Sequence, residues 1–278
     1  MRMMRSLWTA ASGMRAQQVN VDTIANNVAN INTIGYKSQQ ASFKSLLYQN
    51  LQSKSTNNAG EEKPVAAEVG LGSRVAAITS TFTNGNLQAT EDPFSMALEG
   101  DGFFQIRTAG GELQYTRDGG FIISPSAQGN MLCTTDGNAV LDAYGNQIIL
   151  PNTQVATNLV VNEDGTIAFP DATGNPAILT DANGRPVRFG IYQFNNPAGL
   201  AKEGSNNFSV TVASGAAVAE NGNATVQQTR VHQYYTEASN VDVAEEMVNL
   251  IVAQRAYEMN SKAIQTSDEM MQQANNLR

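Results

Sequence analysis

The feature that most constrains this chain is a seven-residue apolar repeat at each end, separated by a long middle region that lacks it. In the first repeat, over residues 6–32, one row of side chains recurs every seven positions and a second row follows three positions later. The rows are Leu7, Met14, Val21 and Val28, and then Ala10, Gln17, Ile24 and Ile31. This spacing predicts a long helix with a coiled-coil-like seam. Asn30, Asn32 and Gly35 are typical of a helix stop.

The second repeat occupies residues 239–277 and predicts a second helix. Its apolar row again recurs every seven positions and is widened by further apolar residues. The row is Val243, Leu250, Tyr257, Ile264 and Met271, and the widening residues are Met247, Ile251, Ala253 and Ala274. Ser239, with Asp242 three positions later, resembles a capping box and predicts the start of this helix. Glu245 and Glu246 add the negative charge that a first helical turn favours.

The two ends of the chain carry opposite charge, +4 over residues 1–50 and −4 over residues 231–278. We therefore expect the helices to pair, with charge selecting the partner and adding little stability, because an exposed ion pair contributes at most about 1 kcal/mol. A lone helix pair is marginal in water, so we expect both helices to be poorly ordered in the free monomer and ordered when many copies pack together. The predicted assembly interface is Leu7, Met14, Val21, Ile24, Val28, Ile31, Val243, Met247, Leu250, Tyr257, Ile264 and Met271.

Two other roles are open for such helices. They could be ordinary core helices, or they could lie on a membrane surface, which their Asn- and Gln-rich polar faces disfavour.

The middle of the chain, residues 75–235, has the pattern of β structure. Short alternating runs such as 103–107, 147–150 and 187–192 lie between Asn-Gly and Asp-Gly pairs. Those pairs favour tight hairpin turns, and their spacing indicates an antiparallel sandwich or barrel. Residues 49–72, rich in Gln, Ser, Asn and Glu, have the composition of a loop or a loosely held extension.

These patterns together predict an α+β fold, in which the N- and C-terminal helices pair as a coiled-coil-like layer and a central antiparallel β domain lies between them in the sequence. The predicted domains are 1–48 with 236–278 as a discontinuous helical assembly domain, 49–80 as an extended connecting segment, and 81–235 as a β-rich outer domain.

Composition excludes several functional classes. The net charge is −8 and the pI is near 4.7, which argues against nucleic acid as the main partner. The single Cys133 excludes an intrachain disulfide or a Cys-rich zinc site, and the single His232 excludes His-rich metal sites. No apolar run approaches the roughly 20 residues of a membrane span, so no membrane insertion is expected. Residues 7–13 are too short and polar for a cleavable leader, so we expect any export to occur without a cleaved signal peptide.

Few residues suggest catalysis. Glu112 and Asp118 could form a glycosidase pair, but each lies beside a glycine turn, where solvated carboxylates are ordinary. Residues 162–165 and 180–184 lack the glutamate of a calcium loop, and residues 70–74 lack the full pattern of a phosphate loop. We therefore predict a protein that is not an enzyme and binds no cofactor or metal. The alternative from another class is a secreted enzyme that acts on peptidoglycan.

Four segments of the sequence are similar to one known family. Residues 22–37, DTIANNVANINTIGYK, closely resemble the N-terminal signature of the bacterial flagellar rod and hook family, and residues 238–264 resemble its C-terminal signature. Residues 100–105 and 115–119 resemble the start of the β domain that the family shares. These segments cover both ends and the middle of the chain, so the resemblance is specific.

Within this family the chain is most similar to subunits of the distal rod. The resemblance implies a structural subunit that polymerises into a hollow helical drive shaft, which transmits torque from motor to hook in the periplasm-spanning part of the basal body. The implied partners are further copies of the chain, proximal rod subunits, hook subunits, the L and P rings and the flagellar export apparatus.

The family also assigns the extended segment, marked here by Gln49, Val69, Gly70 and Gly72, to stiffening the rod. Another axial subunit, of the hook or the proximal rod, is the alternative that the resemblance leaves open.

Overall fold

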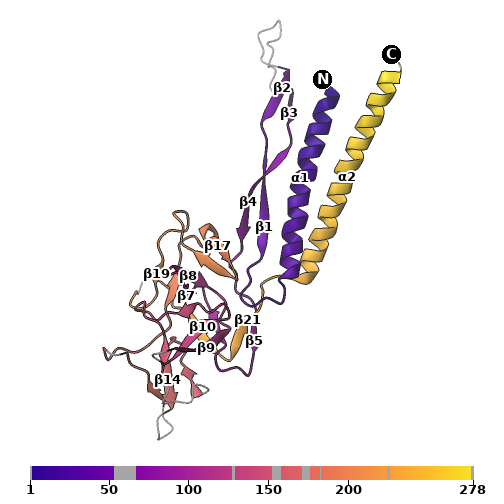
Figure 1. Cartoon of the computed structure of the whole chain (residues 1–278). Helices are drawn as coiled ribbons and strands as arrows, with labels where there is room; N and C mark the ends of the chain where they lie inside the picture. Colours follow the sequence, from indigo (N-terminus) through magenta and orange to yellow (C-terminus); the bar gives the residue numbers. More distant parts are fainter. Residues whose placement is uncertain are drawn as a thin grey trace. The chain divides into compact units, whose positions relative to one another are not determined.

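The structure is a computed structural model that describes residues 2–52, 67–126, 129–151, 158–170, 176–181, 183–223 and 226–276 (Figure 1). Its contacts divide the chain into two units. The helical unit comprises Met1–Ala29, Gln39–Thr79 and Asp242–Arg278, and the β unit comprises Asn30–Ser38 and Ser80–Val241. These contact units differ from the predicted domains, since residues 30–38 belong to the β unit and residues 49–79 to the helical unit. The predicted division stays a prediction about which parts fold independently.

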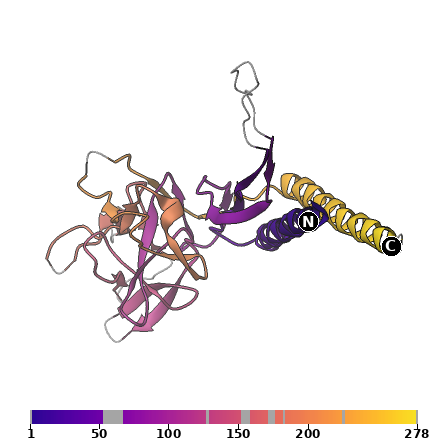
Figure 2. The same ribbon diagram turned by 90° about the horizontal axis from the view of Figure 1, so that it is seen from above.

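The two long helices are α1 (Arg2–Ala29) and α2 (Val243–Asn276), and they lie side by side in both views (Figures 1 and 2). The first ends at Ala29, three residues before the predicted end, and the chain then turns with Thr33 N donating to Asn30 O at 3.2 Å. The predicted start of the second helix at Ser239 is wrong. Asp242 is the N-terminal cap, because its Oδ1 accepts hydrogen bonds from Ala244 N at 2.8 Å and Glu245 N at 3.3 Å. Neither helix is long and apolar enough to span a membrane.

The rest of the helical unit is a ladder of four strands, β1 (Gln39–Ser45), β2 (Tyr48–Gln52), β3 (Ala67–Gly70) and β4 (Ser73–Ser80). The first pairs with the fourth, and the second pairs antiparallel with the third. The expectation of a loop over residues 49–72 is therefore wrong at both ends of that segment, and residues 53–66 lie outside the described part of the chain. Polar residues form strands here because their backbone groups pair across the ladder, which composition does not reveal.

The β unit is antiparallel wherever its strands pair, as expected. Its largest sheet has ten strands along the path β12-β10-β11-β7-β8-β18-β17, with β9, β16 and β19 branching from it, and β13-β14-β15, β20-β6 and β21-β5 form smaller sheets. The strands are β5 (Leu87–Ala89), β6 (Met96–Glu99), β7 (Phe103–Arg107), β8 (Leu113–Thr116), β9 (Phe121–Ser126), β10 (Gly129–Thr134), β11 (Ala139–Val140), β12 (Ile149–Leu150), β13 (Val160–Val161), β14 (Ile167–Pro170), β15 (Pro176–Ile178), β16 (Ile191–Gln193), β17 (Ala201–Gly204), β18 (Asn207–Ser209), β19 (Val218–Ala219), β20 (Arg230–Gln233) and β21 (Tyr235–Glu237).

Strand β7 separates two apolar clusters, because successive side chains of a strand point to opposite faces. Phe104 and Ile106, both 0% exposed, belong to the larger cluster, which also contains Phe121 and Phe189. Phe103, on the other face, joins an aromatic cluster with Tyr115, Phe194, Leu200 and Phe208. The predicted α+β fold is thus confirmed, with two packed helices and a central β unit that buries its own core.

Candidate assembly surface and connector clamp

The two helices run antiparallel in a register that three contacts define. Ser6 Oγ lies 3.3 Å from Ser267 Oγ, and Asn27 Nδ2 donates to Glu246 Oε1 at 2.7 Å. Between them, a Cβ built on Gly13 would lie 2.9 Å from Asn260 Nδ2, so the helices approach closely there. Each advance of seven residues along α1 matches a retreat of seven along α2, which is the geometry of a coiled-coil seam.

The side chains that α1 and α2 bury are small or polar, apart from Ile24. On α1 they are Ala10, Ala16, Thr23, Ile24 and Asn27, and on α2 they are Ala253 and Ser267. The row predicted from Leu7, Met14, Val21 and Val28 is half-buried, because the contacting row lies one position earlier, at Ser6, Gly13 and Asn27. A search for small residues at the same seven-residue spacing would have found it.

Four of the larger apolar side chains of α2 lie on an exposed face of the helix. Val248, Val252, Met259 and Met270 are 59%, 62%, 65% and 49% exposed, and their spacings of 4, 7 and 11 residues place them on one helix face. We call these four residues the outer stripe. Burial of each against a neighbour would contribute roughly 1–2 kcal/mol. A single chain therefore leaves these four apolar side chains of α2 largely uncovered.

The residues predicted as an assembly interface divide between the seam and more exposed positions. On α2, Leu250, Ile264 and Met271 are half-buried, whereas Val243, Met247 and Tyr257 are exposed. On α1, Ile24 is buried, and Ile31 lies beyond the end of the helix in the β unit, where it is half-buried. Contact of these residues with other copies stays a prediction.

Asn27 joins three elements of the helical unit. Its Oδ1 accepts from Gln39 N at 2.8 Å, and its Nδ2 donates to Gln39 O at 2.9 Å and to Glu246 Oε1. Its side chain is 1% exposed, so these bonds replace water at a buried amide. No ion pair links α1 with α2 among the described residues, and the polar contact at Asn27 joins a carboxylate to a neutral amide.

The structure also places the four residues of the predicted stiffening segment. Gln49 pairs with Val69, and Gly70 with Tyr48, across β2 and β3. Gly72 has φ +115, and a Cβ there would overlap Ser12 Oγ on α1. Only glycine fits this position, and Ser73 N then donates to Ser12 Oγ at 3.3 Å. The ladder is therefore held against α1 at this point, and its stiffening role stays a prediction.

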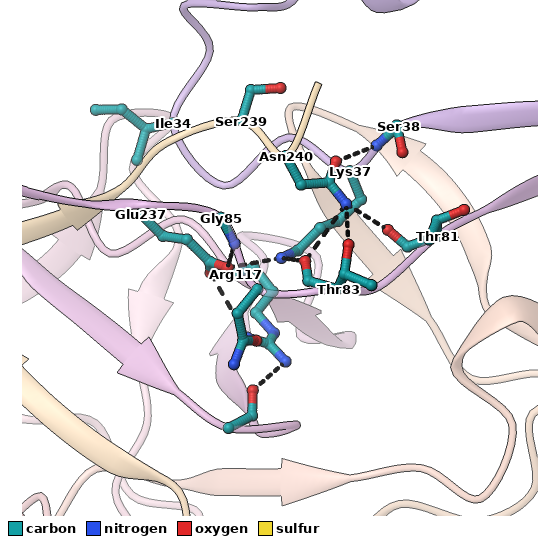
Figure 3. Close-up of polar contacts among 12 residues, drawn as sticks. Ile34, Lys37, Ser38, Thr81, Thr83, Gly85, Arg117, Glu237, Ser239 and Asn240 are labelled. Atoms are coloured by element: carbon teal, nitrogen blue, oxygen red, sulfur yellow. Dashed lines mark hydrogen bonds and ion pairs between the residues drawn. The ribbon is translucent and has the colours of Figure 1, made fainter. Parts of the chain in front are cut away.

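Within the β unit, two segments meet around a cluster of buried charges (Figure 3). The first connector is Asn30–Ser38, which follows α1 in the sequence, and the second connector is residues 235–241, which precede α2. Gly35 N donates to Glu237 O at 2.8 Å, and Gly35 has φ +68 with its Cα packed against the backbone of Arg117 and Asp118. We call Lys37, Arg117, Glu237 and Asn240 the connector clamp.

The centre of the connector clamp is the carboxylate of Glu237, which is 1% exposed. Its Oε1 accepts from Lys37 Nζ at 2.6 Å and from Gly85 N at 2.9 Å, and its Oε2 lies 3.5 Å from Arg117 Nη1. Burial lowers the pKa of Lys37 and of Arg117, and the charge of Glu237 opposes both shifts. Two cations thus share one buried carboxylate.

Sequence reasoning missed the connector clamp, because its charges come from distant parts of the chain. The residue types are ordinary, and only the fold brings Lys37 of the N-terminal signature next to Glu237 of the C-terminal one. Two local features could have pointed to this site. Gly35 allows a close approach of two backbone segments, and Lys37 follows the apolar Tyr36.

The residues considered for catalysis have structural roles. Asp118 Oδ1 accepts from Gly120 N at 2.9 Å and closes a turn, and burial raises its pKa. Glu112 is exposed, with its backbone bonded to Thr108 across another turn. His232 Nε2 lies 2.8 Å from Glu99 Oε2 at the surface. Among the described residues, no cluster of His, Cys, Asp or Glu could hold a metal ion.

Three family models match this chain. A flagellar basal-body rod protein model covers residues 7–37, a flagellar hook protein FlgE/F/G D1 domain model covers residues 97–169, and a flagellar basal-body rod FlgEFG protein C-terminal model covers residues 232–277. The outer two matches each contain a helix together with its connector.

Full-length relatives decide the family. The flagellar basal-body rod protein FlgG of Borreliella burgdorferi is 42% identical over 99% of both chains, and that of Caulobacter vibrioides is 39% identical over 99% of this chain and all of its own. This chain belongs to the FlgG family of flagellar rod proteins. The flagellar hook-basal body complex protein FlhP of Bacillus subtilis is also similar, at 33% identity over 99% of this chain and all of its own. As a FlgG-family member, the chain is a structural subunit of the flagellar distal rod and assembles in the basal body with other flagellar components.

Proposed function

We propose that this FlgG-family chain polymerises through its helical unit into a hollow helical tube, which serves as the drive shaft that carries torque from motor to hook. The observation that carries the proposal is the outer stripe of α2, where four large apolar side chains are about half or more exposed in a single chain. Clusters of exposed apolar side chains are typical of interaction sites. Copies related by a rotation that does not close build filaments rather than rings.

The partners extend the same proposal. The ends of the shaft contact proximal rod subunits and hook subunits, and its outer surface turns inside the L and P rings. The chain spans the periplasm as part of the rod and reaches it through the flagellar export apparatus without a cleaved signal peptide. We assign it no catalytic activity, cofactor, nucleic acid or membrane insertion, in keeping with a structural role in the basal body.

The first experiment concentrates the purified full-length chain and examines it by electron microscopy. Straight hollow tubes are the expected result, because a rod subunit should form a stiff polymer. Single particles at every concentration would contradict the proposal. A deletion strain provides the cellular counterpart, since basal bodies isolated from it should lack a full-length rod, and a plasmid copy of the gene should restore it.

Another axial subunit is the second candidate, and the similarity to FlhP, a hook-basal body complex protein, favours it. The extended segment marked by Gln49, Val69, Gly70 and Gly72 separates the two candidates. If this segment stiffens a distal rod, a chain that lacks residues 49–72 should form bendable, hook-like tubes. If the chain that lacks residues 49–72 still forms straight tubes of unchanged stiffness, the result would support the second candidate, that the protein is another axial subunit.

A further inference from the structure

The two connectors of the β unit share more than one hydrogen bond. Asn240 Oδ1, in the second connector, accepts from Ser38 N in the first at 2.7 Å. Asn240 Nδ2 donates to Thr81 O at 2.9 Å and to Thr83 Oγ1 at 2.8 Å, and Lys37 Nζ donates to Thr83 O at 2.7 Å. The residues around Thr81 therefore contact both connectors at once (Figure 3).

The charges of the connector clamp are unequal, with two cations and one carboxylate. Arg117 is held independently of the connectors, because its Nη2 donates to Gly100 O at 2.6 Å and its Nη1 to Asn84 Oδ1 at 3.2 Å. Lys37 has only Glu237 and the Thr83 carbonyl as described partners. Removal of Glu237 would leave two buried cations with only the weaker charge interactions of Asp101 and, for Arg117, of Glu220, whereas removal of Lys37 would leave Arg117 paired with Glu237.

We propose that Glu237 is a positioning residue that couples the two connectors, so that each docks on the β unit only together with the other. Its side chain holds Lys37 and its backbone carbonyl holds Gly35, both in the first connector, although 200 positions separate Glu237 from Lys37. The first connector directly follows α1 and the second directly precedes α2. Glu237 therefore couples the two points at which the helices join the β unit. The proposal concerns the single chain and does not depend on polymerisation.

Hydrogen–deuterium exchange of the full-length chain tests this coupling. In Glu237→Gln, exchange should rise on the order of 100-fold in both connectors, because a buried cation loses its partner. The amides of β7 and β10 should keep their wild-type rates, which an overall loss of stability would not allow. The matched control is Glu220→Gln, which alters another carboxylate of the same unit. Glu220 is 5% exposed, and its hydrogen bonds go to Thr229 and Gln193. This control should change exchange in the connectors far less than Glu237→Gln does, because the charge of Glu220 acts on Arg117 more weakly than that of Glu237.

Two further variants keep the test decisive if Glu237→Gln fails to fold. Lys37→Met alters only the first connector, yet coupling requires that exchange in residues 235–241 also rise, by about tenfold. The double variant Lys37→Met/Glu237→Gln should exchange more slowly than Glu237→Gln alone, because it leaves one buried cation without its Glu237 partner instead of two. A Lys37→Met effect confined to residues 30–38, or a double variant no better than the single one, would overturn the proposal.

Discussion

The helical unit and the β unit bury opposite kinds of side chain. In the β unit, Phe103, Phe104 and Phe121 are at most 1% exposed. Phe104 lies edge-to-face with Phe121, and Phe103 lies edge-to-face with Phe194. In the helical unit, the buried residues are mostly alanine, serine, threonine and asparagine, and the large side chains Val252 and Met259 face outward.

The contrast indicates that the two units obtain their stability from different sources. Apolar burial is the main favourable term in folding, and the β unit completes it within one chain. The helical unit gains its closest contacts from small residues and hydrogen bonds, and its exposed apolar side chains would become buried only against other molecules. This is the physical basis for expecting that the helices depend on neighbouring copies.

The largest expected effect follows from placing a charge in the outer stripe. Val252→Asp should raise the concentration needed for tube formation on the order of 100-fold or more, because an unpaired charge would be buried at each contact. The β unit should keep its wild-type unfolding midpoint. Sedimentation of tubes over a concentration series measures the first effect, and denaturant unfolding measures the second.

The control for this variant is Gln254→Asp, which adds the same charge at an exposed polar position of α2. It should leave the critical concentration within a few-fold of the wild type. If Val252→Asp forms tubes as readily as Gln254→Asp, the outer stripe is not the interface. The conclusion that the helical unit depends on neighbouring copies for its stability would then be wrong.

A substitution that creates a cavity in the core of the β unit provides the converse test. Phe104 is 0% exposed, with ring centroids 5.1 Å from Phe121 and 5.6 Å from Phe189. Phe104→Ala should lower the free energy of unfolding of this unit by about 3–5 kcal/mol, measured by chemical denaturation. Leu113→Ala, at a 46% exposed position, should cost well under 1 kcal/mol. Equal losses in the two variants would show that this core is not tightly packed.

An intermediate effect is expected at Asn27. Asn27→Ala removes three hydrogen bonds and leaves Gln39 and Glu246 without these partners, at a cost of about 2–3 kcal/mol to the helical unit. The measurement is the thermal loss of helical circular dichroism in assembled tubes. Gln18→Ala, at an exposed position of α1, is the control and should melt like the wild type. A variant of Asn27 that also melts like the wild type would show that polar seam contacts contribute little.

Local pattern predicts the elements of this fold better than their contacts. The seven-residue repeats predicted both helices, and the alternating run at 103–107 coincides with β7, because each pattern has the period of its own element. The sequence pattern predicted that the first row of the seam contains Met14, whereas the contacting row contains Gly13. An apolar pattern identifies residues that favour burial, but it does not identify small residues that allow two helices to approach closely. The pairing of Gln49 with Val69 and of Lys37 with Glu237 joins distant residues, and no local period records such contacts.

The smallest expected effect concerns the surface pair of His232 and Glu99. The hydrogen bond with His232 lowers the pKa of Glu99 below its ordinary value of 4.5, burial opposes that shift, and the neighbouring Arg230 adds a further, smaller lowering. A carboxyl group whose pKa is lowered by folding adds stability above its unfolded pKa, and that stability is lost as the pH falls through the folded value. Glu99→Gln should therefore flatten the acid side of the stability curve below about pH 4.5, and at pH 7 it should lose only the small contribution of an exposed pair. Chemical denaturation of both proteins from pH 3 to pH 7 measures this. Because the pair is exposed, a loss at pH 7 as large as that of Phe104→Ala would contradict the view that the β unit is held by its core rather than by its surface charges.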